Sequence, residues 1–195
     1  MTTTDSPFGL RPSRMRGSGA NTNGMNDYPV STGYNTNIFT GDIVKNQGGV
    51  IRRMCLSTDR AIGVFMGCRY TAANGTPTWS PYWPAGTVTS DAQAMVVDNP
   101  SANYIIQADA SLSAGSLNSF NFDVTFGAGN TATGMSGFAL AANSATSVSR
   151  MLRIIRFVDQ PGNNVIDSSA ERAFPLCEVR LVQSVDDYLT VSTTS

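Results

Sequence analysis

The chain has 195 residues, enough for one full hydrophobic core or for two small β units in contact. Its hydrophobic content of 41% predicts a folded protein, whereas its charged content of 14% is well below the 25% or so of an ordinary domain. The 13 basic and 14 acidic residues nearly cancel, which argues against general attraction to nucleic acid or to an anionic membrane. No histidine is present, so the commonest general base and metal ligand is missing.

The first 27 residues differ from the rest of the chain. They have few apolar side chains and no clear periodicity, and they carry Arg11, Arg14 and Arg16. Such a segment buries too little apolar surface to offset the entropy lost when it is ordered. We therefore expect residues 1–27 to form an extended arm, either mobile or ordered against a partner. Its arginines are expected to pair with partner carboxylates, with weak nucleic-acid contact or plain solvation as the alternatives.

From residue 28 onwards, short apolar segments alternate with turn residues. This pattern predicts a mainly β body over 28–195, a β-sandwich or jelly-roll-like fold with long loops. The body is expected to be either one unit or two small β units, 28–109 and 110–195. The clearest strand is predicted from Ala61 to Tyr70, with period-two alternation. The residues predicted to share its one apolar face are Ile62, Val64, Met66, Cys68 and Tyr70.

The second half of the chain is harder to assign. Residues 110–149 are rich in small polar residues, which predicts loops and short strands and allows a short helix over 111–119. Arginines three residues apart over 150–156 would fit a helix face, but the β-branched residues and the Pro161-Gly162 stop favour a strand over 150–159. A further strand is predicted after Pro175. No internal repeat of fixed period is detectable.

The usual catalytic patterns are absent. Without histidine there is no Ser-His-Asp or Cys-His arrangement, and Lys45, the sole lysine, follows no phosphate-binding glycine run. Three scattered cysteines, Cys55, Cys68 and Cys177, do not make a zinc site. A pair of aspartates could serve a glycosidase, but most of them occupy turn positions. We therefore expect a protein that is not an enzyme and that needs no metal and no cofactor.

One aromatic segment, residues 78–85, holds both tryptophans of the chain. Trp79, Tyr82 and Trp83 lie here among prolines. Three interpretations are open: the rings cover one end of the core, they anchor a protein partner, or they form a stacking platform for sugar. We take them, together with the three arginines of the arm, as the candidate partner interface.

Several runs resemble small structural proteins of aquatic tailed bacteriophages. These runs are Phe-Gly-Leu-Arg-Pro at 8–12, the segments 31–45 and 62–71, Ser-Pro-Tyr-Trp-Pro-Ala at 80–85, and the Gly-rich segment 129–137. The resemblance implies a virion protein synthesised in the cytoplasm of a bacterial host.

From this resemblance we expect a capsid decoration, or cement, protein that binds the outside of the major capsid protein lattice and stabilises the shell. Phage cement proteins are often homotrimers, so self-association into a trimer is implied as well. Met1 to Asp5 are polar and no apolar run is long enough to span a membrane, so we expect no signal peptide and no membrane contact. The balanced charge predicts no direct nucleic-acid binding. The alternatives are a tail- or fibre-associated virion protein with a carbohydrate-binding aromatic surface and, third, a free carbohydrate-active β-sandwich.

Overall fold

The computed structural model describes residues 4–16, 24–56, 58–113, 120–146, 150–158 and 173–182. These residues form antiparallel sheets and contain no helix, so none of them belongs to a helix that could cross a membrane. The predicted mainly β, sandwich-like body is therefore confirmed. The strand predicted over 150–159 is confirmed as residues 152–157, while most of the helix considered at 111–119 lies outside the described residues.

The first sheet curls into a small barrel, which we call the first barrel. Its strands, in spatial order, are β2 (Asn26–Pro29), β9 (Gln93–Val97), β6 (Gly63–Thr71), β4 (Ile43–Gln47) and β5 (Val50–Arg53). A parallel bridge between Val30 and Ile51 joins the two edges. β7 (Pro77–Ser80) pairs with the end of β6 that β4 leaves free, and β3 (Ile38–Phe39) pairs with β8 (Tyr82–Trp83) in a separate ribbon.

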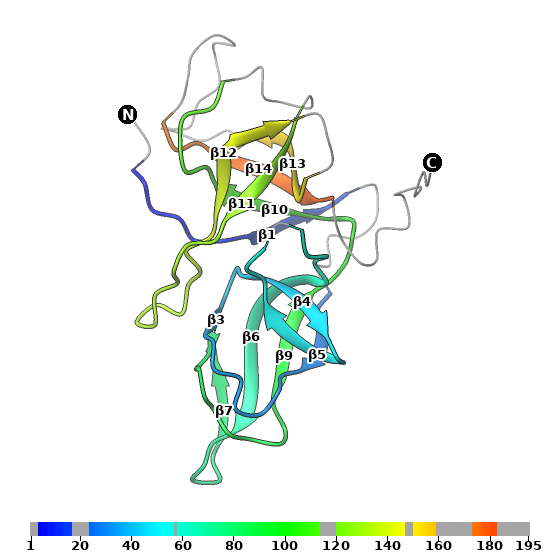
Figure 1. Cartoon of the computed structure of the whole chain (residues 1–195), viewed down its shortest axis with the longest axis vertical. Helices are drawn as coiled ribbons and strands as arrows, with labels where there is room; N and C mark the ends of the chain where they lie inside the picture. Colours follow the sequence, from blue (N-terminus) through cyan, green and yellow to red (C-terminus); the bar gives the residue numbers. More distant parts are fainter. Residues whose placement is uncertain are drawn as a thin grey trace.

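The second sheet closes in the same way and forms the second barrel. Its strands are β10 (Ala102–Gln107), β14 (Leu176–Leu181), β13 (Leu152–Phe157), β11 (Asn121–Thr125) and β12 (Ala139–Thr146). Here the edges meet at a parallel bridge between Ala108 and Leu140. β1 (Arg11–Met15) pairs with β10 and adds a sixth strand to the sheet. Figure 1 shows the two barrels one above the other, with β1 crossing near their junction.

The two barrels share one topology. When the five barrel strands of each are numbered in chain order, both follow the spatial order 1-5-4-2-3. In both, a parallel bridge between strand 3 and the end of strand 1 closes the barrel. The registers correspond as well, because strand 4 of each barrel has an irregularity against strand 5. It falls between Phe65 and Gly67 in the first barrel and between Ile154 and Arg156 in the second. The fold is thus duplicated within the chain, although the sequence shows no repeat.

The irregularity in β6 changes which side chains face which core. Ile62, Phe65 and Cys68 belong to the core inside the first barrel. Val64 belongs instead to the larger core that fills the second barrel and continues across the junction, and Met66 packs against that core. The prediction that alternate residues from 62 to 70 share one face was therefore wrong. The irregularity between Phe65 and Gly67 inverts the alternation, so Met66 and Cys68 face different cores. Ile62 precedes β6 and does not share the face of Val64.

A buried ion pair of the first barrel is hydrogen-bonded to the second barrel. Asp42, beside β4, is fully buried; the Arg53 Nε donates to its carboxylate at 2.7 Å, and the Ser136 hydroxyl donates at 2.6 Å. Arg53 also donates to the carbonyl of Gly127 in the β11–β12 connection. Burial raises the pKa of Asp42 more than Arg53 and the hydrogen bonds lower it. The pair fixes how the second barrel sits on the first.

The N-terminal segment, residues 4–16, is a strap laid over both barrels. The Gly9 amide donates to the carbonyl of Phe138 in the second barrel, and the Leu10 amide donates to that of Gly41 in the first. Leu10 is fully buried. Gly9 has a φ of 74°, and a Cβ there would lie 2.6 Å from the Gly41 oxygen, so no larger residue fits this crossing. The described part of the predicted arm therefore lies against its own chain.

Candidate functional site

The three aromatic residues singled out from the sequence do not share a surface. Trp83 is fully buried inside the first barrel, and its indole N–H donates to the carbonyl of Tyr34. Tyr82 is partly buried and stacks on Phe39 with ring centroids 5.5 Å apart. Trp79, by contrast, is 66% exposed. Of the three, only Trp79 is placed to contact a ligand or a partner with most of its ring.

Trp79 belongs to a row of side chains that runs across three strands. On β7 it pairs in register with Arg69 of β6, which pairs in turn with Gln93 of β9. The Arg69 guanidinium lies 5.7 Å from the centroid of the Trp79 ring and forms an ion pair with Asp27 at 2.6 Å. Because residues paired across adjacent strands project from the same face of a sheet, this Trp79 row is a consequence of register alone.

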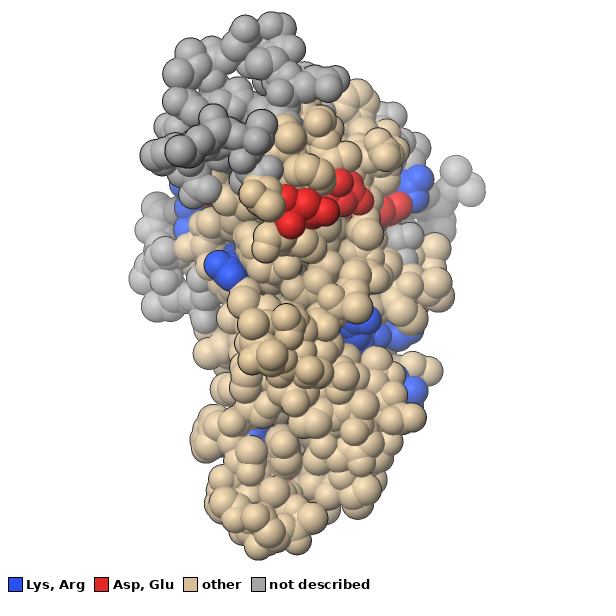
Figure 2. Space-filling model, turned by 90° about the vertical axis from the view of Figure 1, so that its left-hand side faces the viewer, with Lys and Arg blue, Asp and Glu red and all other residues tan. Residues whose placement is uncertain are grey.

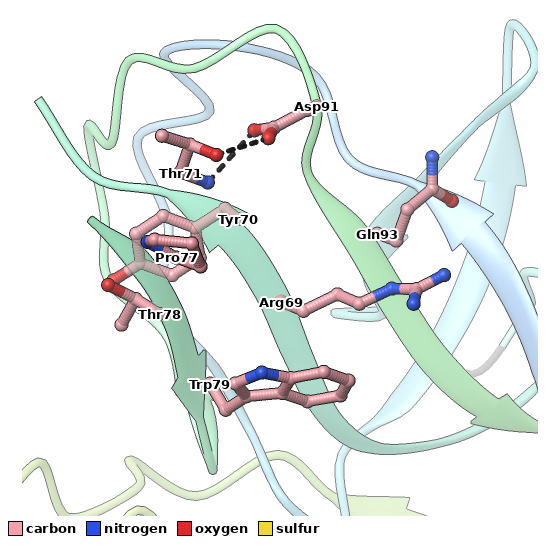
Figure 3. A pocket seen from close by; sticks show the side chains of 8 residues that line it. All are labelled: Arg69, Tyr70, Thr71, Pro77, Thr78, Trp79, Asp91 and Gln93. Carbon is pink, nitrogen blue, oxygen red and sulfur yellow. Dashed lines mark hydrogen bonds between the residues drawn. The ribbon is translucent and has the colours of Figure 1, made fainter. Parts of the chain in front are cut away.

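The Trp79 row borders a hollow of about 300 Å³, shown in Figure 3. Asp91 lies at the end of the hollow away from Trp79 and accepts hydrogen bonds from the Thr71 amide at 2.9 Å, the Thr71 hydroxyl at 2.6 Å and the Thr89 hydroxyl. These bonds lower the pKa of Asp91 to about 2, so its carboxylate is ionised at all ordinary pH values. The residues that line the hollow are Arg69, Tyr70, Thr71, Pro77, Thr78, Trp79, Asp91 and Gln93.

The chemistry of this hollow suits binding and not proton transfer. Among its lining residues Asp91 is the single carboxylate, and it is held in the ionised form. The pKa of Tyr70 is raised, mainly by burial and further by Cys68 and Tyr82, so the phenol keeps its proton. No cluster of three or more metal-ligating side chains occurs in the part of the chain that the structure describes.

The three arginines of the N-terminal segment lie on or next to β1. Arg11 is exposed and stacks over Phe8, with the guanidinium carbon 4.2 Å from the ring centroid. Arg14 is about half exposed, and Arg16, just after the strand, is exposed and has no side-chain partner among the described residues. We call Arg11, Arg14 and Arg16 the arginine edge. On the face shown in Figure 2 charged side chains are few, and the acidic ones gather over the second barrel.

A buried carboxylate anchors the arginine edge. Glu178 on β14 is fully buried and accepts hydrogen bonds from Arg14 Nε at 2.6 Å, from Asn103 Nδ2 at 2.8 Å and from Arg156. Burial raises the pKa of Glu178, but the hydrogen bonds from Asn103, Arg14 and Arg156, with the charge of Arg156, outweigh burial and leave the pKa below its ordinary value. This network fixes β1 on the second barrel.

Sequence reasoning missed Arg69, Asp91 and Gln93, which line the hollow together with Trp79, and Glu178 beside Arg14. Each belongs to a different strand or connection from its partner, and no local motif signals that they meet. Comparison with known proteins supplies no further guide, since no family model, no curated protein and no solved structure matches this chain.

Proposed function

We propose that this protein is a virion structural protein, a capsid cement protein that binds the outer surface of the major capsid protein lattice through the arginine edge. The observation that carries the proposal is the presentation of Arg11, Arg14 and Arg16 on and just after the edge strand β1. Guanidinium groups bind carboxylates with two parallel hydrogen bonds and are enriched at protein interfaces. The resemblance of the sequence to phage structural proteins supplies the class of partner.

Rigidity of the arginine edge supports a binding role. Arg14 is held by the buried Glu178, and the preceding Leu10 is fully buried between the barrels. A strand ordered before binding loses less conformational entropy on the partner than a mobile arm would. Several such edges on one shell, or on the homotrimer that the resemblance implies, would add avidity without a strong individual contact.

Co-sedimentation with capsid shells tests this proposal. The probe is the emptied shell of the virus whose genome carries this sequence, stripped of its outer proteins, and the variant is Arg11→Ala with Arg16→Ala. Arg14 is left intact because its removal would take one of three hydrogen-bond donors from the buried Glu178 and so disturb the fold. Loss of two exposed charge-assisted contacts should weaken shell binding on the order of tenfold.

The matched control is Arg60→Ala, which removes an exposed arginine from the connection between β5 and β6. It should bind shells as the unaltered protein does. Equal binding by the double variant and the control would contradict the role of the arginine edge, and failure of the unaltered protein to bind shells would contradict the cement function itself.

A tail- or fibre-associated virion protein is the second candidate. The exposed Trp79 and its hollow favour it, because such proteins contact surfaces outside the particle. Antibody labelling of intact particles separates the two candidates: label over the shell supports the cement protein, and label confined to the tail supports the alternative.

A further inference from the structure

Trp79 is exposed for a structural reason. β7 is added outside the first barrel, on the part of β6 that β4 does not cover, so its outward side chains face no second layer. The indole ring is 66% exposed, and the guanidinium of Arg69 approaches one part of it. An aromatic ring held on a sheet and left open to water offers a stacking surface whose electron-rich face attracts partly positive C–H groups.

The surroundings of Trp79 include charged and hydrogen-bonding side chains, unlike the centre of a protein interface. Interface centres are depleted of charge and join several apolar side chains. Here Arg69 lies beside the ring, Gln93 lies one strand further across, and Thr71 and Asp91 form the far end of the hollow. Tyr70 and Pro77 add apolar surface to its lining. Apolar surface bordered by hydrogen-bonding groups matches a ligand that has an apolar face and a polar rim.

The polar groups retain unused hydrogen-bonding capacity. The side-chain amide of Gln93 has no hydrogen-bond partner among the described residues, so two donors and an acceptor are free. Asp91 Oδ1 accepts two hydrogen bonds but Oδ2 accepts only the one from the Thr71 hydroxyl, which leaves an acceptor site open. Arg69 has five N–H groups, of which one is bonded to Asp27.

The size and charge of the hollow limit the class of ligand further. Arg69 and Thr71 lie two residues apart on β6, about 7 Å along the strand, which is the length of one six-membered ring with its substituents. Arg69 is already neutralised by Asp27, and Asp91 adds a negative charge. An anionic ligand would therefore be repelled.

We infer that the Trp79 hollow is a binding site for a neutral carbohydrate, with one sugar ring stacked on Trp79 and its hydroxyl groups hydrogen-bonded to Gln93, Asp91 and Arg69. The site lies on the first barrel and the arginine edge on the second, so the inference goes beyond shell binding and does not depend on it. In a virion protein it would provide contact with a glycan-coated surface.

Tryptophan fluorescence of the full-length protein tests the inference. The probes are neutral oligosaccharides of glucose, galactose and mannose, with uronic acid oligosaccharides as charged counterparts. Because Trp83 is fully buried, a change in emission on binding reports Trp79. We expect saturable binding of at least one neutral series with millimolar affinity, and weaker binding of the uronic acids.

Variants connect that signal to the site. Trp79→Ala should lower affinity at least tenfold and Gln93→Ala about threefold to tenfold, measured by calorimetry or ligand-observed NMR because the first variant lacks the reporting indole. Val88→Ala, at a residue that is 75% exposed and does not line the hollow, is the matched control and should leave affinity unchanged. The emission of the buried Trp83 verifies that each variant is folded.

Three outcomes would overturn the inference: no neutral oligosaccharide binds at concentrations up to about 10 mM, Trp79→Ala binds as tightly as the control, or the uronic acids bind best. If Trp79→Ala instead lost shell binding and no glycan bound, the hollow would be a protein contact, so the inference would fail while the cement function stood. Loss of shell binding in the arginine variant with glycan binding intact would have no bearing on this site.

Discussion

Replacing Glu178 by glutamine would test whether one buried carboxylate holds the strap on the second barrel. Glu178 is fully buried and accepts hydrogen bonds from Arg14, Arg156 and Asn103. In Glu178→Gln one of its two acceptor atoms becomes an NH₂ group that faces a guanidinium, so a donor meets a donor. Breaking a fully buried pair costs about 3–5 kcal/mol. The side chains of Arg14 and Arg156 are 48% and 47% exposed, so water replaces part of the lost interaction. We therefore expect the free energy of unfolding to fall by about 2–3 kcal/mol.

Urea unfolding followed by circular dichroism measures this loss, and thermal unfolding should show a midpoint about 4–12 °C lower. The matched control is Asp59→Asn, which removes a carboxylate 2.7 Å from Lys45 in a pair that is partly exposed. Exposed pairs contribute less than about 1 kcal/mol, so the control should be nearly as stable as the unaltered protein. Equal losses in the two variants would refute the reasoning.

Acid provides a second test of the same carboxylate. The pKa of Glu178 in the folded protein lies below its ordinary value of 4.5. A group with a lowered pKa stabilises the fold above the ordinary value, and this contribution is lost as the pH falls through 4.5 towards the lowered pKa. The stability difference between the unaltered protein and Glu178→Gln should therefore narrow below about pH 4. A difference that stays constant down to pH 3 or so would contradict the lowered pKa.

Two further predictions concern packing and thiol chemistry. Gly63→Ala would place a Cβ 2.3 Å from a carbonyl oxygen of β9 and should lower the free energy of unfolding in urea by roughly 1–3 kcal/mol. Gly24→Ala, with nothing within 4 Å of its Cβ, is the control and should leave the stability unchanged. Equal stabilities of the two variants would show that β9 moves aside at no cost. Burial raises the pKa of Cys68 to about 12 and also raises the pKa of Cys177, whereas Cys55 is exposed. A thiol reagent at pH 8 should therefore label one cysteine in the folded protein and all three in denaturant, and rapid labelling of Cys68 would count against the first-barrel core.

Local patterns in the sequence were sufficient for the class of fold and for several strands. The apolar alternation of Cys177, Val179 and Leu181 predicts a strand that the structure places at Leu176–Leu181, because side-chain periodicity is a property of a few neighbouring residues. The face of each strand was less predictable. Met66 departs from its predicted face because an irregularity in pairing with β9 inverts the pattern, and nothing in residues 61–70 alone marks that position.

The candidate sites depend on contacts that local patterns do not contain. Arg14 and Glu178 are separated by 164 positions. Trp79 and Gln93 belong to one row only because both pair in register with Arg69 of β6. The sequence marked the arginines and both tryptophans as candidates, but it could not show that Trp79 is exposed and Trp83 is buried. That difference arises because the turn between β7 and β8 places one ring outside the barrel and the other inside it.

The duplicated barrel explains how one chain holds two different surfaces. In each barrel, one residue of strand 5 pairs with the residue of strand 4 that follows the irregularity. This residue is Met95, opposite Gly67, in the first barrel and Glu178, opposite Arg156, in the second. At this position the second barrel has the carboxylate that anchors the strap, and the first has an apolar side chain. The connection between strands 4 and 5 of the first barrel adds β7, and with it Trp79. Because Trp79 lies on the first barrel and the arginine edge on the second, substitutions at the two sites should act independently of each other.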